Sequence, residues 1–170
     1  MQKVIHRNET ILKDKELEIV KSLLSGNTFK DITVLAFSIT DASAQLLRNY
    51  GVSVIFFLSS IEQSSIKYSY ALGTLQGSLI SLPFADNTFD LVINESDVYN
   101  KSKIIFEKII RETIRVLKPK GIGLFAKSQT LNIFRRSMRR TISERTTIKL
   151  IESFEGKISQ SLNRFFVFSK

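Results

Sequence analysis

The sequence predicts an α/β fold, in which helices cover both faces of a mostly parallel β-sheet. Residues 32–39, 52–58 and 88–94 form short runs that are apolar on both faces, as the central strands of a parallel sheet are. Amphipathic patterns of helical period stand between these runs, and strands that alternate with helices build a covered parallel sheet. The chain closes on two strand-like segments, 147–156 and 163–170, with no helix between them. One antiparallel strand is therefore expected at or near a sheet edge.

Three helices are expected in the first half of the chain. Residues 12–24 carry apolar side chains at helical spacing between charged ones. The next helix, 41–51, begins after an N-cap candidate, either Asp41 or Thr40, and ends in a glycine. A weaker helical pattern covers residues 60–73.

The second half repeats this alternation. Residues 74–84 are short and mixed, and residues 101–117 form a long amphipathic helix that Pro119 and Gly121 are expected to stop. The remaining predicted elements before the two closing strands are a strand at 122–128 and a helix at 130–140.

Composition limits the possible functions. With 170 residues, the chain is expected to form a single domain, residues 1–170, on which a helical N-terminal segment, residues 1–27, packs. The absence of cysteine and the presence of a single histidine, His6, argue against disulfides, thiol chemistry and a metal site. No signal-peptide pattern and no apolar run of about 18 residues occurs, so we expect a soluble, cytoplasmic protein and no membrane contact.

One pair of segments is more specific than these patterns. "SLPFADNTFDLVINESDVYN" is followed by "IIRETIRVLKPKGIGLFAKS". The two segments resemble the second half of class I S-adenosylmethionine-dependent methyltransferase domains of the type 11-like group. The matching residues are Leu82, Pro83, Phe84, Asp86, Phe89, Asp90, Leu91, Val92, Glu112, Arg115, Val116, Leu117, Lys118, Pro119 and Gly121. Lys120 replaces the first of two glycines in that pattern.

The resemblance implies a three-layer sandwich around a seven-stranded, mostly parallel, Rossmann-like sheet whose last strand is antiparallel. It also implies where a cofactor would bind. The family has an acidic residue at the end of the first strand and then a turn of the form Gly-x-Gly-x-Gly. Here Ala36 stands at the acidic position, and Ser38, Thr40 and Ala42 stand at the glycine positions.

Two further positions of the same pocket depart from the family. The acidic residue expected after the second strand is replaced by Leu58 or Ser59, and the acidic residue before Leu-Pro-Phe is replaced by Ser78. Three altered elements in one pocket indicate that the cofactor has been lost, so no cofactor is expected. If the domain is active, the resemblance implies S-adenosylmethionine, and the binding residues would be Phe37, Ser38, Thr40, Ser59, Ser78 and Asn94.

The loop "NESDVYN" follows the fourth strand, where the family places residues that face the methyl group and the substrate. Asn94, Glu95, Asp97 and Tyr99 are therefore candidates for a polar reaction site. The alternative is a solvated loop in which Asp97 forms a turn.

A basic segment follows the fifth strand. Five arginines, Arg135, Arg136, Arg139, Arg140 and Arg145, fall within "LNIFRRSMRRTISER". Like charges four residues apart repel on a helix, and guanidinium groups suit phosphates. The pattern favours a polyanionic partner, and the alternative is a solvated face that pairs with glutamates of the next segment. Residues 121–170 hold ten Lys or Arg and three Glu, so +7 of the net charge of +9 lies there.

Three functions remain open from the sequence. The first is a degenerate methyltransferase-like domain, a pseudoenzyme that works as a binding or assembly module for a protein or an RNA–protein partner through the basic segment. The alternative is an active S-adenosylmethionine-dependent methyltransferase with an eroded glycine turn, acting on RNA or protein. The third is a domain that resembles the N-terminal, cofactor-free methyltransferase-like domain of the anamorsin family of iron–sulfur assembly factors. That family's cysteine-rich tail is missing here, so its cluster chemistry is not implied.

Overall fold

The computed structural model describes residues 13–23, 31–37, 39–59, 74–95, 102–127, 143–161 and 165–170. In chain order these residues form α1 (Asp14–Leu23), β1 (Thr33–Phe37), α2 (Asp41–Asn49), β2 (Ser53–Ser59), β3 (Thr74–Gly77), β4 (Phe89–Asn94), α3 (Lys103–Val116), β5 (Leu117–Ala126), α4 (Glu144–Ser153), β6 (Lys157–Ser161) and β7 (Phe165–Ser169). The helices predicted over 60–73 and 130–140 lie outside the described residues.

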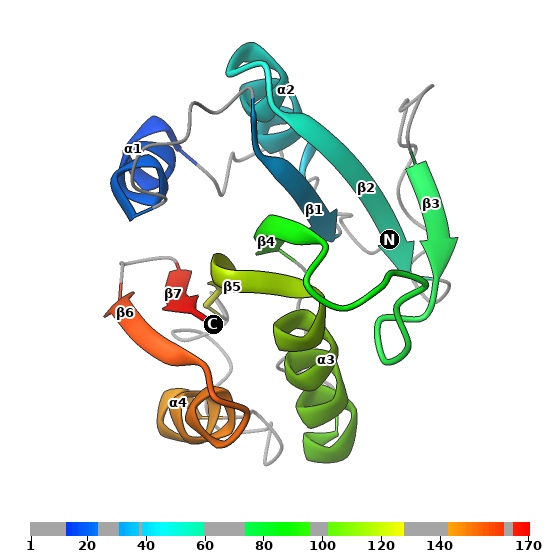
Figure 1. Cartoon of the computed structure of the whole chain (residues 1–170), viewed down its shortest axis with the longest axis vertical. Coiled ribbons are helices and arrows are strands. Elements are labelled where there is room, and N and C mark those ends of the chain that lie inside the picture. Colours follow the sequence, from blue (N-terminus) through cyan, green and yellow to red (C-terminus); the bar gives the residue numbers. More distant parts are fainter. Residues whose placement is uncertain are drawn as a thin grey trace, which may run out of the picture.

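All the described strands belong to one sheet, in the order β3-β2-β1-β4-β5-β7-β6 (Figure 1). The strands from β3 to β5 pair in parallel, whereas β7 is antiparallel to both β5 and β6. The predicted fold class, a mostly parallel sheet whose last strand is antiparallel, is confirmed.

Helices cover both faces of this sheet. On one face, Leu17 of α1 and Leu47 of α2 pack in a cluster with Val34 of β1. On the other face, Ile110 of α3 and Ile151 of α4 pack in a second cluster with residues of the same strands. Figure 1 shows α1 and α2 on one side of the sheet and α3 and α4 on the other. This is a three-layer α/β/α arrangement.

The prediction of a strand over residues 147–156 is wrong, because most of this segment belongs to α4. Ser143 is the N-cap of α4, and its hydroxyl accepts a hydrogen bond from the Thr146 N–H at 3.2 Å. Thr147 and Ile151, four residues apart, are both fully buried on one side of the helix. Helical burial overrides the β-branched composition that suggested a strand.

The end of α3 differs slightly from the prediction. The helix stops at Val116, and β5 begins with the next residue, Leu117. Lys120, which stands where the family has a glycine, adopts a φ of 66°, in the left-handed region that favours glycine. Its N–H donates to the carbonyl oxygen of Lys170 at 3.1 Å, which ties this part of β5 to the residue after β7.

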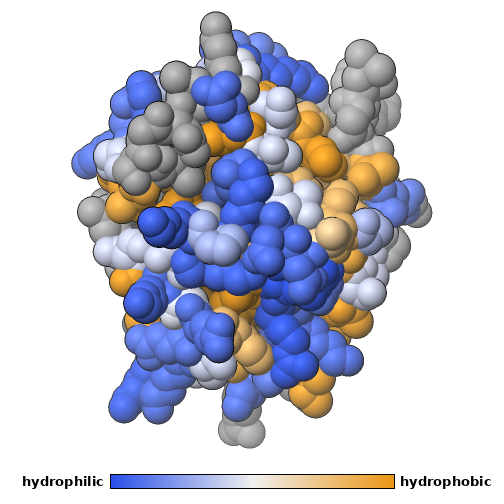
Figure 2. Space-filling view, in the orientation of Figure 1, coloured by the Kyte–Doolittle hydropathy of each residue, from blue (hydrophilic) through white to orange (hydrophobic). Residues whose placement is uncertain are grey.

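The surface is mixed. On the face viewed in Figure 2, hydrophilic residues cover the middle, and apolar residues lie in smaller patches nearer the margins. The large apolar side chains that are exposed in the described part of the chain are Leu75, Ile80, Ile104 and Ile105.

Candidate functional site

The carboxyl ends of β1 and β4 lie beside each other, and the candidate site forms there. Phe37, the last residue of β1, pairs with Asn94, the last residue of β4. The N–H of Glu95 then donates to the carbonyl oxygen of Phe37 at 3.2 Å, which continues the strand pairing by one step. α2 begins just beyond β1, after its N-cap residue Thr40. In open α/β sheets, the space outside the carboxyl ends of the strands is the usual place for a ligand.

The side chain of Glu95 reaches from the end of β4 to the start of α2. Its Oε2 accepts a hydrogen bond from the Thr40 N–H at 2.8 Å, and its Oε1 accepts one from the Ser43 hydroxyl at 2.6 Å. Glu95 is only 6% exposed. Charge-assisted hydrogen bonds of this length are strong, and a helix N-terminus favours negative charge. The carboxylate is therefore held in one place by donors of another element.

Thr40 and Ser43 also bond to each other. The Thr40 hydroxyl oxygen accepts from the Ser43 N–H at 3.2 Å, as an N-cap does, and the Thr40 hydroxyl donates to Ser43 Oγ at 3.0 Å. Hydrogen bonds thus run from the Thr40 hydroxyl through the Ser43 hydroxyl to Glu95. Ser43 is fully buried. The first turn of α2 is tied internally and to β4.

Aromatic side chains fill the sheet face beside this site. The rings of Phe37 and Phe57, both essentially buried, meet edge to face with centroids 5.9 Å apart. Phe57 meets Phe84 at 6.0 Å, and Phe84 meets Phe89 at 4.9 Å, also edge to face. A Cβ at Gly77 of β3 would lie 2.8 Å from the Phe57 ring, so the ring already contacts the glycine backbone. The ends of β1, β2 and β3 are joined here by apolar packing.

Ala36, at the position where the family has an acidic residue, is buried in the apolar cluster beneath α1 and α2. On β2, Ser59 is the last residue, and its backbone pairs with Gly77. Ser78 follows β3, is exposed, and its hydroxyl oxygen accepts from the Ile80 N–H at 3.4 Å. The structure thus brings Phe37, Thr40, Asn94 and Glu95 together, and it places Ser59 and Ser78 at the ends of β2 and β3.

Of the other predicted site residues, the structure describes Arg145, which does not belong to this cluster. Arg145 lies on α4, where its side chain is exposed. Those outside the described residues are Ser38, Asp97, Tyr99, Arg135, Arg136, Arg139 and Arg140. Sequence reasoning did not identify Ser43. Its position three residues after the N-cap candidate Thr40 places its hydroxyl in the first turn of the helix, which is the signal that was overlooked.

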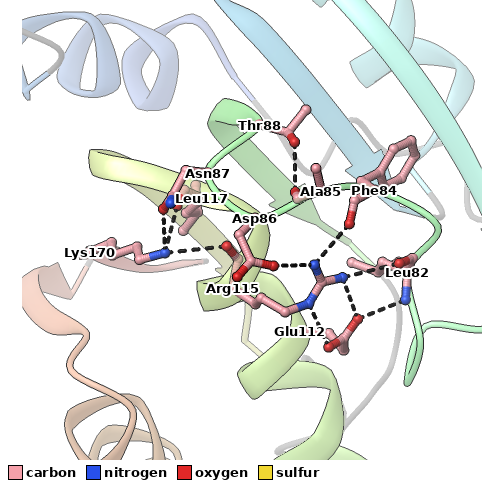
Figure 3. A network of polar contacts seen from close by, with 10 residues as sticks. All are labelled: Leu82, Phe84, Ala85, Asp86, Asn87, Thr88, Glu112, Arg115, Leu117 and Lys170. Atoms are coloured by element: carbon pink, nitrogen blue, oxygen red, sulfur yellow. Dashed lines mark hydrogen bonds and ion pairs between the residues drawn. The ribbon is translucent and has the colours of Figure 1, made fainter.

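Residues of the matching motifs form a separate polar network near the amino ends of the parallel strands (Figure 3). The Arg115 guanidinium donates to Glu112 at 2.9 and 2.8 Å, to Asp86 at 2.7 Å, and to the carbonyl oxygens of Phe84 at 2.8 Å and Leu82 at 3.1 Å. Glu112 also accepts from the Leu82 N–H at 2.8 Å. The hydrogen bonds from Arg115 lower the pKa of Glu112, and those to Glu112 and Asp86 raise the pKa of Arg115. These motif residues hold the loop before β4 against α3.

A second motif pair has a similar role. Lys118 donates to the two carboxylate oxygens of Asp90 at 3.0 and 2.9 Å. Asp90 also accepts from the Thr33 N–H at 2.9 Å. This contact joins the starts of β1, β4 and β5, so the matching residues serve the scaffold.

The scaffold can now be compared with known proteins. The family model described as a methyltransferase domain matches residues 38–125, which is more than half of the 170 residues. The chain belongs to this family. No curated protein sequence matches this methyltransferase domain.

Solved structures share the fold at low sequence identity. A protein of Pyrococcus horikoshii is 18% identical with a TM-score of 0.62, and the match covers 94% of this chain and 92% of that one. A TehB-like S-adenosylmethionine-dependent methyltransferase of Corynebacterium glutamicum is 12% identical with a TM-score of 0.63, covering 89% and 85%. A candidate sarcosine dimethylglycine methyltransferase of Galdieria sulphuraria is 18% identical with a TM-score of 0.58, and this chain covers 58% of its length, with 84% of this chain matched.

Two further findings concern metal ligands and membrane-spanning helices among the described residues. Among the described residues, no group of three or more His, Asp or Glu side chains could hold a metal ion. The same part of the chain contains no helix that is long and apolar enough to cross a membrane.

Proposed function

We propose that this methyltransferase domain does not take up S-adenosylmethionine in the manner of its family and that it serves as a binding or assembly module. The observation that carries the proposal is the position of Glu95. Its carboxylate bonds the Thr40 amide and the Ser43 hydroxyl, at the turn where the family's glycines bring the backbone close to the cofactor. The Glu95 carboxylate already accepts hydrogen bonds from the turn's backbone N–H and hydroxyl donors, so these donors are not available to a bound cofactor.

The walls of the site support the same conclusion. The chain has no glycine between Asp31 and Arg48, so side chains stand where the family's turn leaves room for a ligand. No acidic residue occurs between Ser53 and Ser60 to accept hydrogen bonds from a ribose diol. A buried hydroxyl left unpaired costs about 1–3 kcal/mol, and each 1.4 kcal/mol is about tenfold in affinity. The residues present therefore do not fit the cofactor in the usual pose.

The charge of the chain favours a polyanionic partner. Residues 121–170 carry most of the net positive charge, and Arg145 in this part is exposed on α4. Phosphate groups of an RNA–protein complex, or an acidic protein surface, would neutralise such a region, and binding through phosphates weakens as salt rises.

Cofactor binding is tested by thermal unfolding of the wild-type chain with about 1 mM S-adenosylmethionine or S-adenosylhomocysteine. A ligand at about 100 times its Kd stabilises by about 2.7 kcal/mol, which raises the Tm of a domain of this size by about 5–10 °C. We expect no shift, and we expect equilibrium dialysis to show no retained cofactor. A clear shift would overturn the proposal in favour of the active methyltransferase.

The partner surface is tested separately. Binding of fluorescent poly(U) RNA is measured from about 50 to 300 mM salt for the wild type and for two double variants of equal charge change. Arg135→Glu with Arg139→Glu should abolish binding. Lys15→Glu with Lys21→Glu, on α1, is the matched control and should bind nearly as the wild type does. Equal losses of RNA binding in both double variants would show that only net charge matters. Wild-type binding that does not weaken as salt rises would contradict the assignment of the basic segment as the contact with phosphates.

A further inference from the structure

The carboxylate of Glu95 is placed as a bound ligand would be. The residue is separated from Thr40 and Ser43 by more than fifty positions in the chain, and it comes from a different strand. Its backbone N–H is fixed on the Phe37 carbonyl, so the side chain leaves the sheet at a defined point. From there the two carboxylate oxygens each receive one hydrogen bond from the start of α2.

This contact also satisfies groups that otherwise need a ligand or water. The first N–H groups of a helix have no partner within the helix. The N–H of Thr40, just before the helix, and the buried Ser43 hydroxyl would both lose their acceptor if the carboxylate were absent. A buried carboxylate in turn depends on such donors, because removing it from water without them is unfavourable. Each side of the contact requires the other.

We infer that Glu95 is a built-in carboxylate ligand of the β1–α2 turn, and that truncating it to alanine opens a site for one small monocarboxylate. The inference rests on the proposed function, since it takes the turn to need no external ligand in the native chain. Glu95→Ala removes a CH2COO− group, and acetate supplies the same atoms. The native domain is thus stable without a bound small molecule at this turn, because it carries the anion itself.

The test compares three chains in acetate and in chloride at equal ionic strength. Glu95→Ala should unfold at lower temperature than the wild type in chloride and recover part of the loss in acetate. A site with a Kd of about 30 mM gains about 3–6 °C in Tm at about 0.3 M acetate. The wild type should show no acetate-specific gain. Val20→Ala on α1 is the control, because it removes fully buried apolar atoms and destabilises the fold without taking away a carboxylate. It should be destabilised without acetate-specific recovery.

Several results would overturn the inference. One is an equal acetate effect in all three chains, and the other is the absence of any acetate effect on Glu95→Ala. If Glu95→Ala does not fold even in acetate, a double-mutant cycle of Glu95→Gln and Ser43→Ala decides. Ser43→Ala should then lower the Tm clearly in the wild-type background and less with Glu95→Gln, because the neutral amide oxygen is a weaker acceptor than the carboxylate, whereas additive losses would contradict a direct Glu95–Ser43 contact.

A cofactor arm keeps this inference distinct from the proposed function. A Tm shift of the wild type with S-adenosylmethionine would overturn the proposed function. The acetate recovery of Glu95→Ala would still report on the carboxylate site by itself. Acetate recovery without any cofactor shift would support both.

Discussion

Replacing Arg115 by methionine tests the network that holds the loop before β4. The guanidinium makes five hydrogen bonds, two to Glu112, one to Asp86 and two to backbone carbonyl oxygens. The Arg115–Glu112 contact is the better shielded part, because the side chains are 29% and 16% exposed. Asp86 is 66% exposed, so its ion pair contributes about 0–1 kcal/mol.

The expected loss of stability follows from the contacts of Arg115 that are shielded from solvent. Hydrogen bonds that involve a charged group contribute about 1.5–3 kcal/mol each when buried, and partial exposure reduces this. We expect Arg115→Met to lower the free energy of unfolding by about 2–4 kcal/mol and the Tm by about 5–15 °C. Arg111→Met on the same helix is the control. Arg111 is 63% exposed and pairs with Glu107 at 4.0 Å, so we expect a loss below about 1 kcal/mol.

The effect has a defined pH dependence. The folded protein lowers the pKa of Glu112, mainly through its hydrogen bonds from Arg115. The ionised carboxylate therefore stabilises the fold above its ordinary pKa of about 4.3, and this contribution is lost as the pH falls through the lowered pKa. Urea unfolding at about pH 7 and pH 3.5 should show that the gap between wild type and Arg115→Met narrows at the lower pH. A gap below about 1 kcal/mol at neutral pH, or one that does not change with pH, would refute this reasoning.

Three further predictions concern β4, β5 and β7. Gly123→Ala places a Cβ against the Phe168 ring, and this overpacking should lower the free energy of unfolding by about 1–3 kcal/mol and the Tm with it. Phe168→Leu should partly relieve the loss, and an unchanged Tm would contradict the close approach. Lys118→Met leaves the carboxylate of Asp90, 14% exposed, without its cation, so urea unfolding should show a loss of about 1–3 kcal/mol that Asp90→Asn with Lys118→Met does not deepen. Lys120→Gly relieves the left-handed φ of 66° and should raise the Tm by a few degrees, with Lys120→Ala as the control that should not.

The sheet was predictable because its signals are local and strong. The apolar runs that became β1, β2 and β4 read as buried strands, and the motif around Phe89 and Arg115 matched a known order of elements. The segment that became α4 was mistaken because it is rich in threonine and isoleucine, which favour strands. Its helical signal in the sequence was the Ser143 cap, and the structure shows that the helix packs against α3 and β6.

The candidate site was less predictable. Sequence reasoning identified Glu95 as a candidate reaction residue, and it identified Thr40 as an N-cap candidate. It did not join the two, because their contact depends on β1 and β4 being neighbours and on the direction of one side chain. Altered residues such as Ala36 are visible in the sequence. Only the three-dimensional structure shows that Glu95 accepts the hydrogen bonds of the turn.

The position of β7 has a consequence for how the chain can be made. β7 lies inside the sheet, between β5 and β6, although it follows both in the sequence. During synthesis β6 is therefore made before the strand that will join it to the rest of the sheet. β5 meanwhile has an open edge, and open edges invite pairing with other chains. The strands β5, β6 and β7 therefore cannot pair in the order in which they are made, and β6 joins the sheet only once the five residues of β7 are present.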